Sequence, residues 1–457
     1  MGEMYDPKTG TTKCIAAWQQ RYGRVIPIFC FWDPVLIVTD PAIVREITVK
    51  NFNTWADRYL LGHGDMEQQI IKKGVFFAEG ASWKRIRRIM TPTFSSTKLK
   101  QLTYHINLTS GRLAQKLRDL AVAGRPANAK NCFGAFALDV ICGTAFGLDT
   151  NSLQNRDVPF MKHAQSLLSF DRYVQMRLTI VGLFPWIGKI FQMFNIGFFK
   201  NRDVCFFKEN IMALIKDRKE NDTGHKVADF LQLLLNAEAS DEEDIKEEER
   251  KLTTEEITAQ GIIFIMAGYE TSSSLLQFLS YELARNQEVQ EKLAQEIQSA
   301  LGETEPTYYN VKTLKYMEAV INETLRMYPP VVSLTRQAEV DTVINGRTVP
   351  AGTGVLIPVA NLGRDPEFFP DPHVFRPERF LEKSKENASP LTFLPFGYGP
   401  RACIGLRVAM MEAKIALVHI LRIVRVTSAT PEHLELEEYT GVLVPKDPIQ
   451  LNLQVVP

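Results

Sequence analysis

One cysteine stands in a glycine-rich loop near the end of the 457-residue sequence. The loop reads Phe396-Gly397-Tyr398-Gly399-Pro400-Arg401-Ala402-Cys403-Ile404-Gly405, and apolar residues then recur at helical spacing from Leu406 to about Val424. A thiolate at the start of a helix is stabilised by the helix dipole and by free backbone N–H groups. Such a thiolate could serve as a nucleophile, a redox thiol or a metal ligand.

The residues around Cys403 favour the metal ligand. Gly397 and Gly405 let the backbone approach a flat partner and the sulfur without a Cβ in the way. Phe396 offers an apolar wall, and Arg401 lies two residues before the sulfur, where it could meet an anionic group. A large, flat, iron-bearing anion fits this set, which points to haem with Cys403 as the axial thiolate. Without the loop pattern, a lone cysteine is an ordinary buried apolar residue.

A second stretch with chemical potential lies halfway along a long helical pattern. It reads Ala267-Gly268-Tyr269-Glu270-Thr271 and follows an almost wholly apolar run that begins at Gly261. Glycine costs about 1 kcal/mol in a helix interior relative to alanine, so a gain elsewhere should offset it. Small residues let a large ligand lie against the backbone, and Thr271 can donate back to the carbonyl of Ala267, which would open the helix locally. Taken alone, the stretch is better explained by a tolerated glycine and a packed threonine.

Together the two stretches resemble the haem-binding loop and the oxygen-activation motif of the cytochrome P450 family, the haem-thiolate monooxygenases. The resemblance runs from about Trp18 to Leu453. It implies haem b as the cofactor, with Phe396, Gly397, Gly405 and Ala267 against it. It also implies that Glu270 and Thr271, an acid–alcohol pair, deliver the protons that oxygen activation consumes. The family fold is mainly α with a small β-rich lobe, in which a long central helix lies over the haem and the cysteine loop beneath it.

Further motifs gain a meaning from this resemblance. Glu323 and Arg326 share one helix face, and with Arg379 they resemble the family's buried E-x-x-R network, so we expect a structural role for all three. The family's haem-carboxylate partners correspond to the following residues, the last of them by a looser match: Trp83, Arg87, Arg336, Arg401 and Arg58. Taken singly, each arginine is more often a surface charge.

Three segments are expected to form the walls of an apolar substrate pocket. The central helix contributes one wall, the segment after Pro329-Pro330 a second, and the loop before Trp83 a third. Apolar walls discriminate substrates weakly, by roughly 1–3 kcal/mol per methylene, so we expect several products from one substrate. The residues expected to line these walls are Ile263, Phe264, Ala267, Val331, Val332, Leu334, Phe76 and Phe77.

The amino-acid composition limits the kinds of molecule that the protein is expected to bind. Lysine plus arginine and aspartate plus glutamate both number 53, so the zero net charge gives no sign of nucleic-acid binding. The six cysteines form no C-x-x-C pair, which argues against a disulfide framework and suits a reducing compartment. The family normally begins with a membrane-spanning anchor, and because no such segment opens this sequence we expect the anchor to be missing. We expect a single haem domain over residues 1–457.

Two surface features predict further partners. The segment from Leu183 to Lys200 is crowded with phenylalanine, isoleucine and tryptophan, and it is either a buried helix pair or an exposed patch that enters a membrane. A basic face made of Lys84, Arg85, Arg88, Lys98 and Lys100 would ordinarily be solvated. In the family that face receives an acidic flavoprotein, the NADPH–cytochrome reductase, and cytochrome b5 is a further expected partner. The expected location is the cytoplasmic face of the endoplasmic reticulum membrane.

Three functions remain compatible with these residues. The first is an NADPH- and O2-dependent monooxygenase acting on bulky lipophilic substrates such as steroids and drugs. The second is a redox-neutral isomerase of an endoperoxide, like the family relative thromboxane synthase, and the third is a haem carrier or sensor. The runs from Ile262 to Thr271 and from Asp229 to Leu234 are similar to the vertebrate drug- and steroid-oxidising members of the family. Thr271 favours the first function, because the rearranging relative is expected to lack the alcohol.

Overall fold

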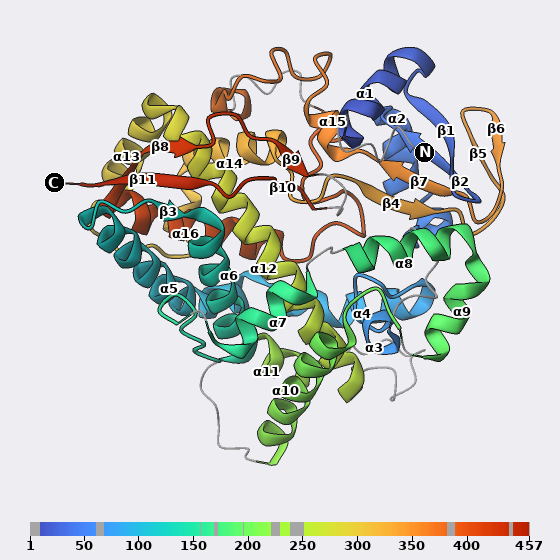
Figure 1. The fold of residues 1–457 in the computed structure, drawn as a ribbon, viewed down its shortest axis with the longest axis horizontal. Helices are drawn as coiled ribbons and strands as arrows, with labels where there is room; N and C mark the ends of the chain where they lie inside the picture. The colour runs from blue at the N-terminus through green and yellow to red at the C-terminus, as the bar shows by residue number, and fades with distance from the viewer. Residues whose placement is uncertain are drawn as a thin grey trace.

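A helix of 32 residues, α12 (Thr254–Arg285), runs through the middle of the computed structural model (Figure 1). The structure describes residues 10–60, 68–155, 157–168, 172–194, 196–220, 229–237, 251–381, 389–437 and 442–456. The predicted helix start is confirmed, because Thr253 and Glu256 form a reciprocal capping box. Within the described residues, α12 alone is long and apolar enough to cross a membrane, but 78% of its most apolar window is buried inside the protein. It is therefore a core helix.

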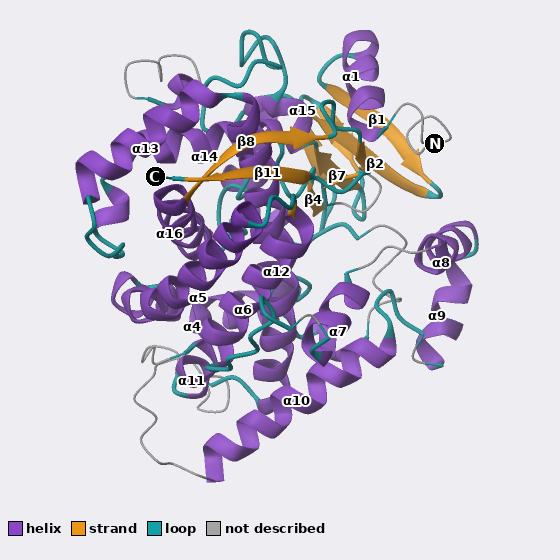
Figure 2. Ribbon diagram, turned by 60° about the vertical axis from the view of Figure 1, so that its left-hand side comes forward, coloured by secondary structure: helices purple, strands orange, loops and turns teal. Residues whose placement is uncertain are grey.

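Other helices surround α12, and α5, α6 and α16 form a layer beside its central and C-terminal part (Figure 2). A large apolar core joins them, and it extends from Phe52 to Leu451 along the chain. The α-helices besides α12 are α1 (Thr11–Tyr22), α2 (Pro41–Arg45), α3 (Gln69–Lys72), α4 (Gly80–Met90), α5 (Ser96–Val122), α6 (Ala129–Phe146), α7 (Pro159–Leu167), α8 (Arg172–Leu183), α9 (Pro185–Met193), α10 (Asn201–Glu220), α11 (Phe230–Leu235), α13 (Gln287–Leu301), α14 (Lys315–Met327), α15 (Val359–Gly363) and α16 (Leu406–Ile423).

The strands form small sheets, and the largest of them lies at the end of the molecule that holds the N-terminus (Figure 1). This four-stranded sheet has the order β1-β2-β7-β4, with β2 and β7 parallel and the other pairs antiparallel. A three-stranded sheet, β3-β11-β8, packs beside α5 and α12. The strands are β1 (Val25–Cys30), β2 (Asp33–Val38), β3 (Ala127–Asn128), β4 (Leu334–Gln337), β5 (Thr342–Ile344), β6 (Arg347–Val349), β7 (Gly354–Ile357), β8 (Val424–Thr430), β9 (Leu436–Glu437), β10 (Val444–Pro445) and β11 (Gln450–Val455).

The segment from Leu183 to Lys200 lies mostly on the surface. It comprises the end of α8, the short helix α9 and the chain that leads into α10, and Figure 2 shows α8 and α9 at the edge of the molecule. Trp186 is 63% exposed and Met193 is 81% exposed, whereas Phe199 is buried against Phe77. The buried-pair interpretation is therefore wrong for most of this segment and holds only for its last residues.

Candidate active site

The cysteine loop is held in place by its own backbone. Cys403 N–H donates to the carbonyl of Phe396 at 2.8 Å, which closes the loop just before α16. Gly397 and Gly399 both have positive φ, at 72° and 76°. A Cβ on Gly399 would lie only 2.0 Å from the carbonyl oxygen of Thr48, so no larger residue fits there.

The sulfur of Cys403 lies in a site built for an anionic ligand atom. Burial raises the pKa of the Cys403 thiol, while a backbone N–H of Gly405 and the charge of Arg87 oppose that rise. Cys403 as a whole residue is nonetheless exposed, so the loop does not pack it into the core as it does an ordinary apolar cysteine. Bound to a metal ion, the thiol would lose its proton outright.

Four arginines that the sequence predicts as carboxylate partners gather around this loop. Arg401 donates to the carbonyls of Ala56 and Ala78 at 2.8 and 2.9 Å, pairs with Asp57 at 3.1 Å, and lies 4.0 Å from the ring centroid of Trp83. Burial, together with the charge of Arg58, lowers the pKa of Arg401 to about 9. Arg401 thus ties the cysteine loop to Ala56, Asp57 and Ala78.

The other three arginines are less completely satisfied. Arg87 donates to the carbonyl of Ala402 at 2.9 Å. Arg58 and Arg336 each bury an Nε that has no hydrogen-bond partner among the described residues. Burial and the neighbouring arginine charges lower the pKa of Arg58 to about 9 and that of Arg336 to about 10. Arg336 also donates from Nη1 to the carbonyl of Thr335 at 2.7 Å. Buried cations that repel one another, two of them with an unpartnered Nε among the described residues, fit a ligand with carboxylates, so these residues suit the propionates of haem.

The middle of α12, around Ala267, is more exposed than the helix on either side. Most residues on either side along the helix are buried, but Ala267 is exposed and Met266, Gly268 and Thr271 are partly exposed. The Thr271 hydroxyl donates to the carbonyl of Ala267, as the sequence predicts. α12 runs without a break from Thr254 to Arg285, and the expected local opening of the helix at Ala267 stays a prediction. A threonine can satisfy its hydroxyl this way while the backbone ladder stays intact.

Comparison with known proteins decides the family. The sequence profile described as Cytochrome P450 matches residues 4–453. The chain belongs to the cytochrome P450 family. It is 38% identical to cytochrome P450 3A29 of Sus scrofa over 437 residues, which cover 95% of this chain and 85% of the relative. It is 36% identical both to cytochrome P450 3A13 of Mus musculus and to cytochrome P450 3A5 of Homo sapiens, in each case over 99% of this chain and 89% of the relative.

Membership in this family establishes the type of reaction that the protein catalyses. This cytochrome P450 is a haem-thiolate monooxygenase that uses O2 and electrons derived from NADPH through a redox partner, and its substrates are lipophilic. The mainly α fold with small sheets, expected from the resemblance, is confirmed.

The acid of the acid–alcohol pair points toward a different helix. Glu270 is buried, and its carboxylate forms an ion pair with Lys130 in the first turn of α6. Sequence reasoning missed Lys130, because nothing in the sequence near Asn128 signals a contact with a residue 140 positions away. Gly268 is also explained by α6, since a Cβ there would lie 2.9 Å from the Cδ1 of Ile141.

The residues predicted to line the substrate pocket fall into separate groups. Phe76 and Phe77 touch edge to face, and a Cβ on the nearby Gly74 would overlap the side chain of Ile263, so the loop and α12 meet. Arg58 lies 4.2 Å from the ring centroid of Phe76. This contact joins the predicted pocket to the arginine cluster.

A second group of the predicted pocket residues lies near the cysteine loop, where Leu334 in β4 is beside Gly397. Val332 is buried behind it and accepts a hydrogen bond from Ala360 N–H, while Val331 pairs with Val442. Phe264 packs with the rings of Phe94 and Phe230, away from the Phe76 loop.

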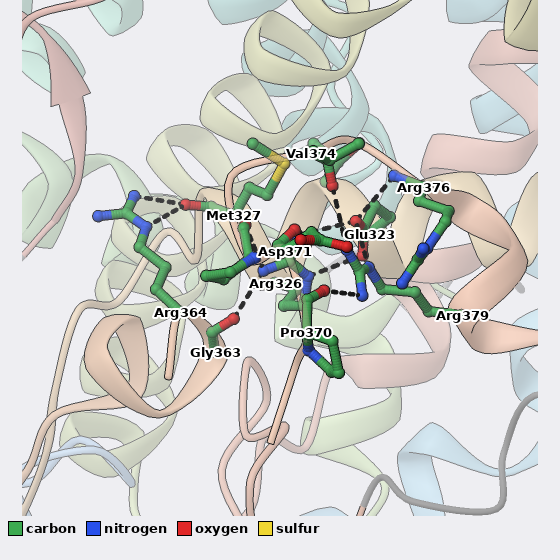
Figure 3. A network of polar contacts seen from close by, with 12 residues as sticks. Glu323, Arg326, Met327, Gly363, Arg364, Pro370, Asp371, Val374, Arg376 and Arg379 are labelled. Carbon is green, nitrogen blue, oxygen red and sulfur yellow. Dashed lines mark hydrogen bonds and ion pairs between the residues drawn. The ribbon is translucent and has the colours of Figure 1, made fainter. Parts of the chain in front are cut away.

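A buried ionic network lies where α14 meets the loop before the cysteine (Figure 3). The Glu323 carboxylate accepts from Arg326 at 2.7 and 2.8 Å, from Arg379 at 3.2 Å and from the backbone N–H of Arg376 at 2.9 Å. Arg326 also donates to the carbonyl of Gly363 at 2.7 Å. The structure therefore brings together the three side chains that the sequence singled out and adds a backbone donor that it did not.

A further carboxyl group is buried between α12 and α16. Glu412 accepts a hydrogen bond from the Ser272 hydroxyl at 2.9 Å, and its second oxygen has no partner among the described residues. Burial raises the pKa of Glu412 to about 8. Ser272 follows directly after Thr271, so this carboxyl ties the oxygen-side helix to the cysteine helix.

We expect Glu412→Gln to stabilise the protein progressively as pH rises. The folded-state pKa lies above the unfolded one, so the unfolded chain releases its proton first and the parent loses stability between about pH 4.5 and 8. The variant has no carboxyl group to titrate at this position, so it does not lose this stability. Its free energy of unfolding should exceed that of the parent by up to about 4–5 kcal/mol near pH 8. Urea unfolding of parent and variant at pH 5 and pH 8 measures the effect. An advantage of the same size at both values would show that Glu412 does not titrate in this range.

Proposed function

We propose that this cytochrome P450 hydroxylates bulky lipophilic substrates such as steroids and drugs, with electrons from an NADPH–cytochrome reductase. The observation that carries the proposal is the Thr271 hydroxyl in the accessible part of an otherwise buried α12. An alcohol there serves proton delivery, which a monooxygenase needs and a redox-neutral isomerase does not. A haem carrier would need neither this alcohol nor the neighbouring acid.

In this proposal the chain holds haem through the residues described above. Cys403 would supply the thiolate that binds the iron, and Arg58, Arg87, Arg336, Arg401 and Trp83 would hold the carboxylate edge. When bound, haem supplies an iron centre that activates O2, and the thiolate donates electron density that favours O–O cleavage. Phe396, Gly397, Gly405 and Ala267 lie against the cofactor. The largest apolar core draws residues from Phe52 to Leu451, and smaller cores lie around the four-stranded sheet. The extent of the largest core along the chain supports a single haem domain.

The chain's own contribution to the reaction is proton delivery and substrate placement. Releasing one oxygen atom as water consumes two protons, and Glu270 and Thr271 pass them from solvent to the accessible side of α12. Ile263, Phe264, Ala267, Val331, Val332, Leu334, Phe76 and Phe77 form the apolar walls. Because apolar walls select by size and shape, they hold a substrate loosely enough for oxidation at more than one position.

We expect Thr271→Ala to uncouple turnover. NADPH would still be consumed, but a larger share of the electrons would leave as peroxide or excess water because proton delivery is no longer controlled. The measurement is product formed per NADPH with a panel of steroids and lipophilic drugs in a reconstituted system. Thr258→Ala is the matched control, because the Thr258 hydroxyl makes the same bond to the carbonyl four residues earlier on the same helix. Unchanged coupling in Thr271→Ala, or product from an endoperoxide without NADPH, would favour the isomerase.

We further propose that the protein lies on the cytoplasmic face of the endoplasmic reticulum membrane through an apolar patch on α8 and α9. The patch consists of exposed side chains: Leu183, Phe184, Trp186, Ile190, Met193 and Phe194. Exposed Phe29 and Trp32 of the β1–β2 hairpin extend it, since Trp32 donates to the carbonyl of Leu183 at 3.0 Å. An apolar surface of this kind is typical of membrane contact.

The triple variant Phe184→Ser, Trp186→Ser and Phe194→Ser is expected to stay folded but to lose its binding to lipid vesicles. Each side chain contributes ~1.5–3 kcal/mol when buried in an apolar medium, so partitioning should fall steeply. Vesicle sedimentation of folded protein measures it. Val122→Ser, at an exposed apolar position on α5, is the control. Equal partitioning of triple variant and parent would reject the membrane assignment.

The proposed docking surface for the reductase, and for cytochrome b5, is the basic face near α4 and the start of α5. Lys84, Arg88 and Lys100 are exposed there, and Lys98 is partly exposed. Arg85 is committed elsewhere, because it pairs with Glu256 at the start of α12. The remaining charges would speed the encounter with an acidic flavoprotein.

A further inference from the structure

Gln260 is a buried polar residue near the start of α12, with 0% of its surface exposed. Its side-chain oxygen accepts from the N–H of Val75 at 2.7 Å, and its side-chain nitrogen donates to the carbonyl of Lys73 at 2.8 Å. The same nitrogen donates to the carbonyl of Glu256 at 3.0 Å, one turn earlier on the helix. A backbone N–H only donates and a carbonyl only accepts, so all three partners agree on the orientation of the amide. The bonds to Val75 and Lys73 form the Gln260 bridge.

The bridge holds the backbone of residues 73–78. In the part of the chain that the structure describes, Gln260 makes every hydrogen bond recorded between this backbone and α12. Within the segment, the N–H groups of Phe77 and Ala78 donate to the carbonyl of Gly74 at 2.9 and 2.8 Å. This turn leaves the N–H of Val75 to Gln260. Because a buried backbone N–H requires an acceptor, the bridge determines where the segment lies on the helix.

The other end of the segment is held by the cysteine loop. Arg401 donates to the carbonyl of Ala78 at 2.9 Å and contacts that of Val75 at 3.5 Å. The segment is therefore fixed at one end to α12 and at the other to the loop that carries the cysteine. Phe76 and Phe77, two of the expected wall residues, lie between these two attachments.

The segment also packs closely against another expected wall residue. A Cβ on Gly74 would lie 2.4 Å from the Cγ1 of Ile263, so the backbone of the segment reaches the side chains of α12. Apolar contact of this kind has no preferred direction, whereas a hydrogen bond depends steeply on distance and angle. Gln260 is thus the contact that sets the position of Phe76 and Phe77 along the helix.

We propose that Gln260 is a positioning residue that fixes the wall made of Phe76 and Phe77 against α12 and so determines which carbon atom of a bulky lipophilic substrate is oxidised. An apolar wall selects by shape, so its position decides which part of the substrate is presented for reaction. A misplacement of about 1 Å is enough to change a rate by a large factor. The inference rests on the hydroxylation and the pocket walls proposed above.

The test compares two changes at Gln260. Gln260→Met keeps a long side chain of similar size and removes the bridge. Gln260→Glu keeps the bridge while its carboxyl group is neutral, because the acid accepts from Val75 and donates to Lys73. Burial favours the neutral acid at low pH, and the carboxylate that forms as pH rises cannot donate. The ionisable residues that Gln260 bonds, Lys73 and Glu256, each have an oppositely charged partner.

Gln277→Met is the matched control. Gln277 is also a buried glutamine of α12, but it donates to the carbonyl and the hydroxyl of Ser273, at 3.2 and 3.1 Å, within its own helix. The first readout needs no turnover and is hydrogen exchange of the Val75 amide. Loss of its acceptor in Gln260→Met should speed that exchange by about 10-fold or more, and Gln277→Met should leave it unchanged.

The second readout is the ratio of hydroxylated products formed from testosterone, together with kcat and KM. Gln260→Met should change the product ratio several-fold and raise KM more than it lowers kcat, because the wall contacts the substrate and not the reacting oxygen. Phe76→Ala should also change the ratio, and Gln277→Met should keep that of the parent. Gln260→Glu should match the parent near about pH 6 and approach Gln260→Met near about pH 9.

The outcomes separate this inference from the function on which it rests. A parent that forms no hydroxylated product with NADPH and reductase refutes the proposed function, and the inference falls with it. An active parent whose product ratio is unchanged in Gln260→Met overturns the positioning role alone, and so does a loss of activity that Gln277→Met shares at constant ratio. If Gln260→Met does not fold, Gln260→Glu decides the matter, because a product ratio that stays constant with pH overturns the inference.

Discussion

Replacing Cys403 by histidine is expected to move the absorption band of the reduced carbon-monoxide complex to the position typical of histidine-ligated haem. NADPH-supported oxidation should fall to background in the same variant, because a neutral imidazole lacks the electron donation of a thiolate. Cys403 is exposed as a whole residue, the loop that carries it is closed by the Cys403–Phe396 hydrogen bond, and a backbone N–H of Gly405 faces the sulfur. The loop is therefore suited to a cysteine sulfur as the ligand of the iron.

The matched control is Cys205→His, since Cys205 is the other exposed cysteine among the described residues. It lies on α10, far along the chain from the cysteine loop, and should keep the parent's band and activity. A variant that fails to bind haem would be recognised by its lost absorption, and Cys403→Ser then tests the ligand with a smaller change in shape. An unchanged band in a folded, haem-loaded Cys403→His protein would contradict the assignment of Cys403 as the iron ligand.

The parts of this structure that short-range patterns encode were predictable. The capping box at Thr253 and Glu256 fixes the start of α12. Asn345 and Gly346 adopt positive φ in the tight turn between β5 and β6, as the dipeptide predicts. The dipeptide Asp33-Pro34 is by itself typical of a turn, but Asp33 pairs with Cys30 inside the β1–β2 hairpin, and the turn falls at Phe31 and Trp32.

What the sequence could not reveal depends on contacts between distant segments. Lys130 looks like a solvated helix residue until α6 is placed on α12, and Glu412 looks like a surface charge until α16 is placed below it. Helical periodicity reports which face of a helix is apolar but not which polar residue on another helix it meets. Lys130 is paired with Glu270, and Glu412 is bonded to Ser272 next to Thr271, so both lie close to the acid–alcohol motif. Such contacts between distant segments are less visible in the sequence than the motifs that define the family.

The buried network at Glu323 is where we expect the largest loss of stability. Glu323→Gln keeps the shape of the side chain but leaves the guanidinium groups of Arg326 and Arg379, with 0% and 7% of their side chains exposed, without a counter-charge. Breaking a buried pair in this way costs about 3–5 kcal/mol. Urea unfolding should show a correspondingly lower free energy, and haem content after purification should fall because the loop carrying Arg379 leads to the cysteine.

The control is Glu378→Gln in the neighbouring turn. Glu378 pairs with Lys292 at 3.5 Å with both side chains largely exposed, and such surface pairs contribute about 0–1 kcal/mol. A double-mutant cycle then separates burial from pairing: if Glu323 matters because it neutralises Arg379, then Glu323→Gln/Arg379→Gln should lose less stability than the two single changes added together. Strict additivity would instead mean that each side chain serves through its own backbone contacts, such as that of Arg379 to the carbonyl of Asp371 at 2.7 Å. In that case the network would be a set of separate loop anchors and not an ionic unit.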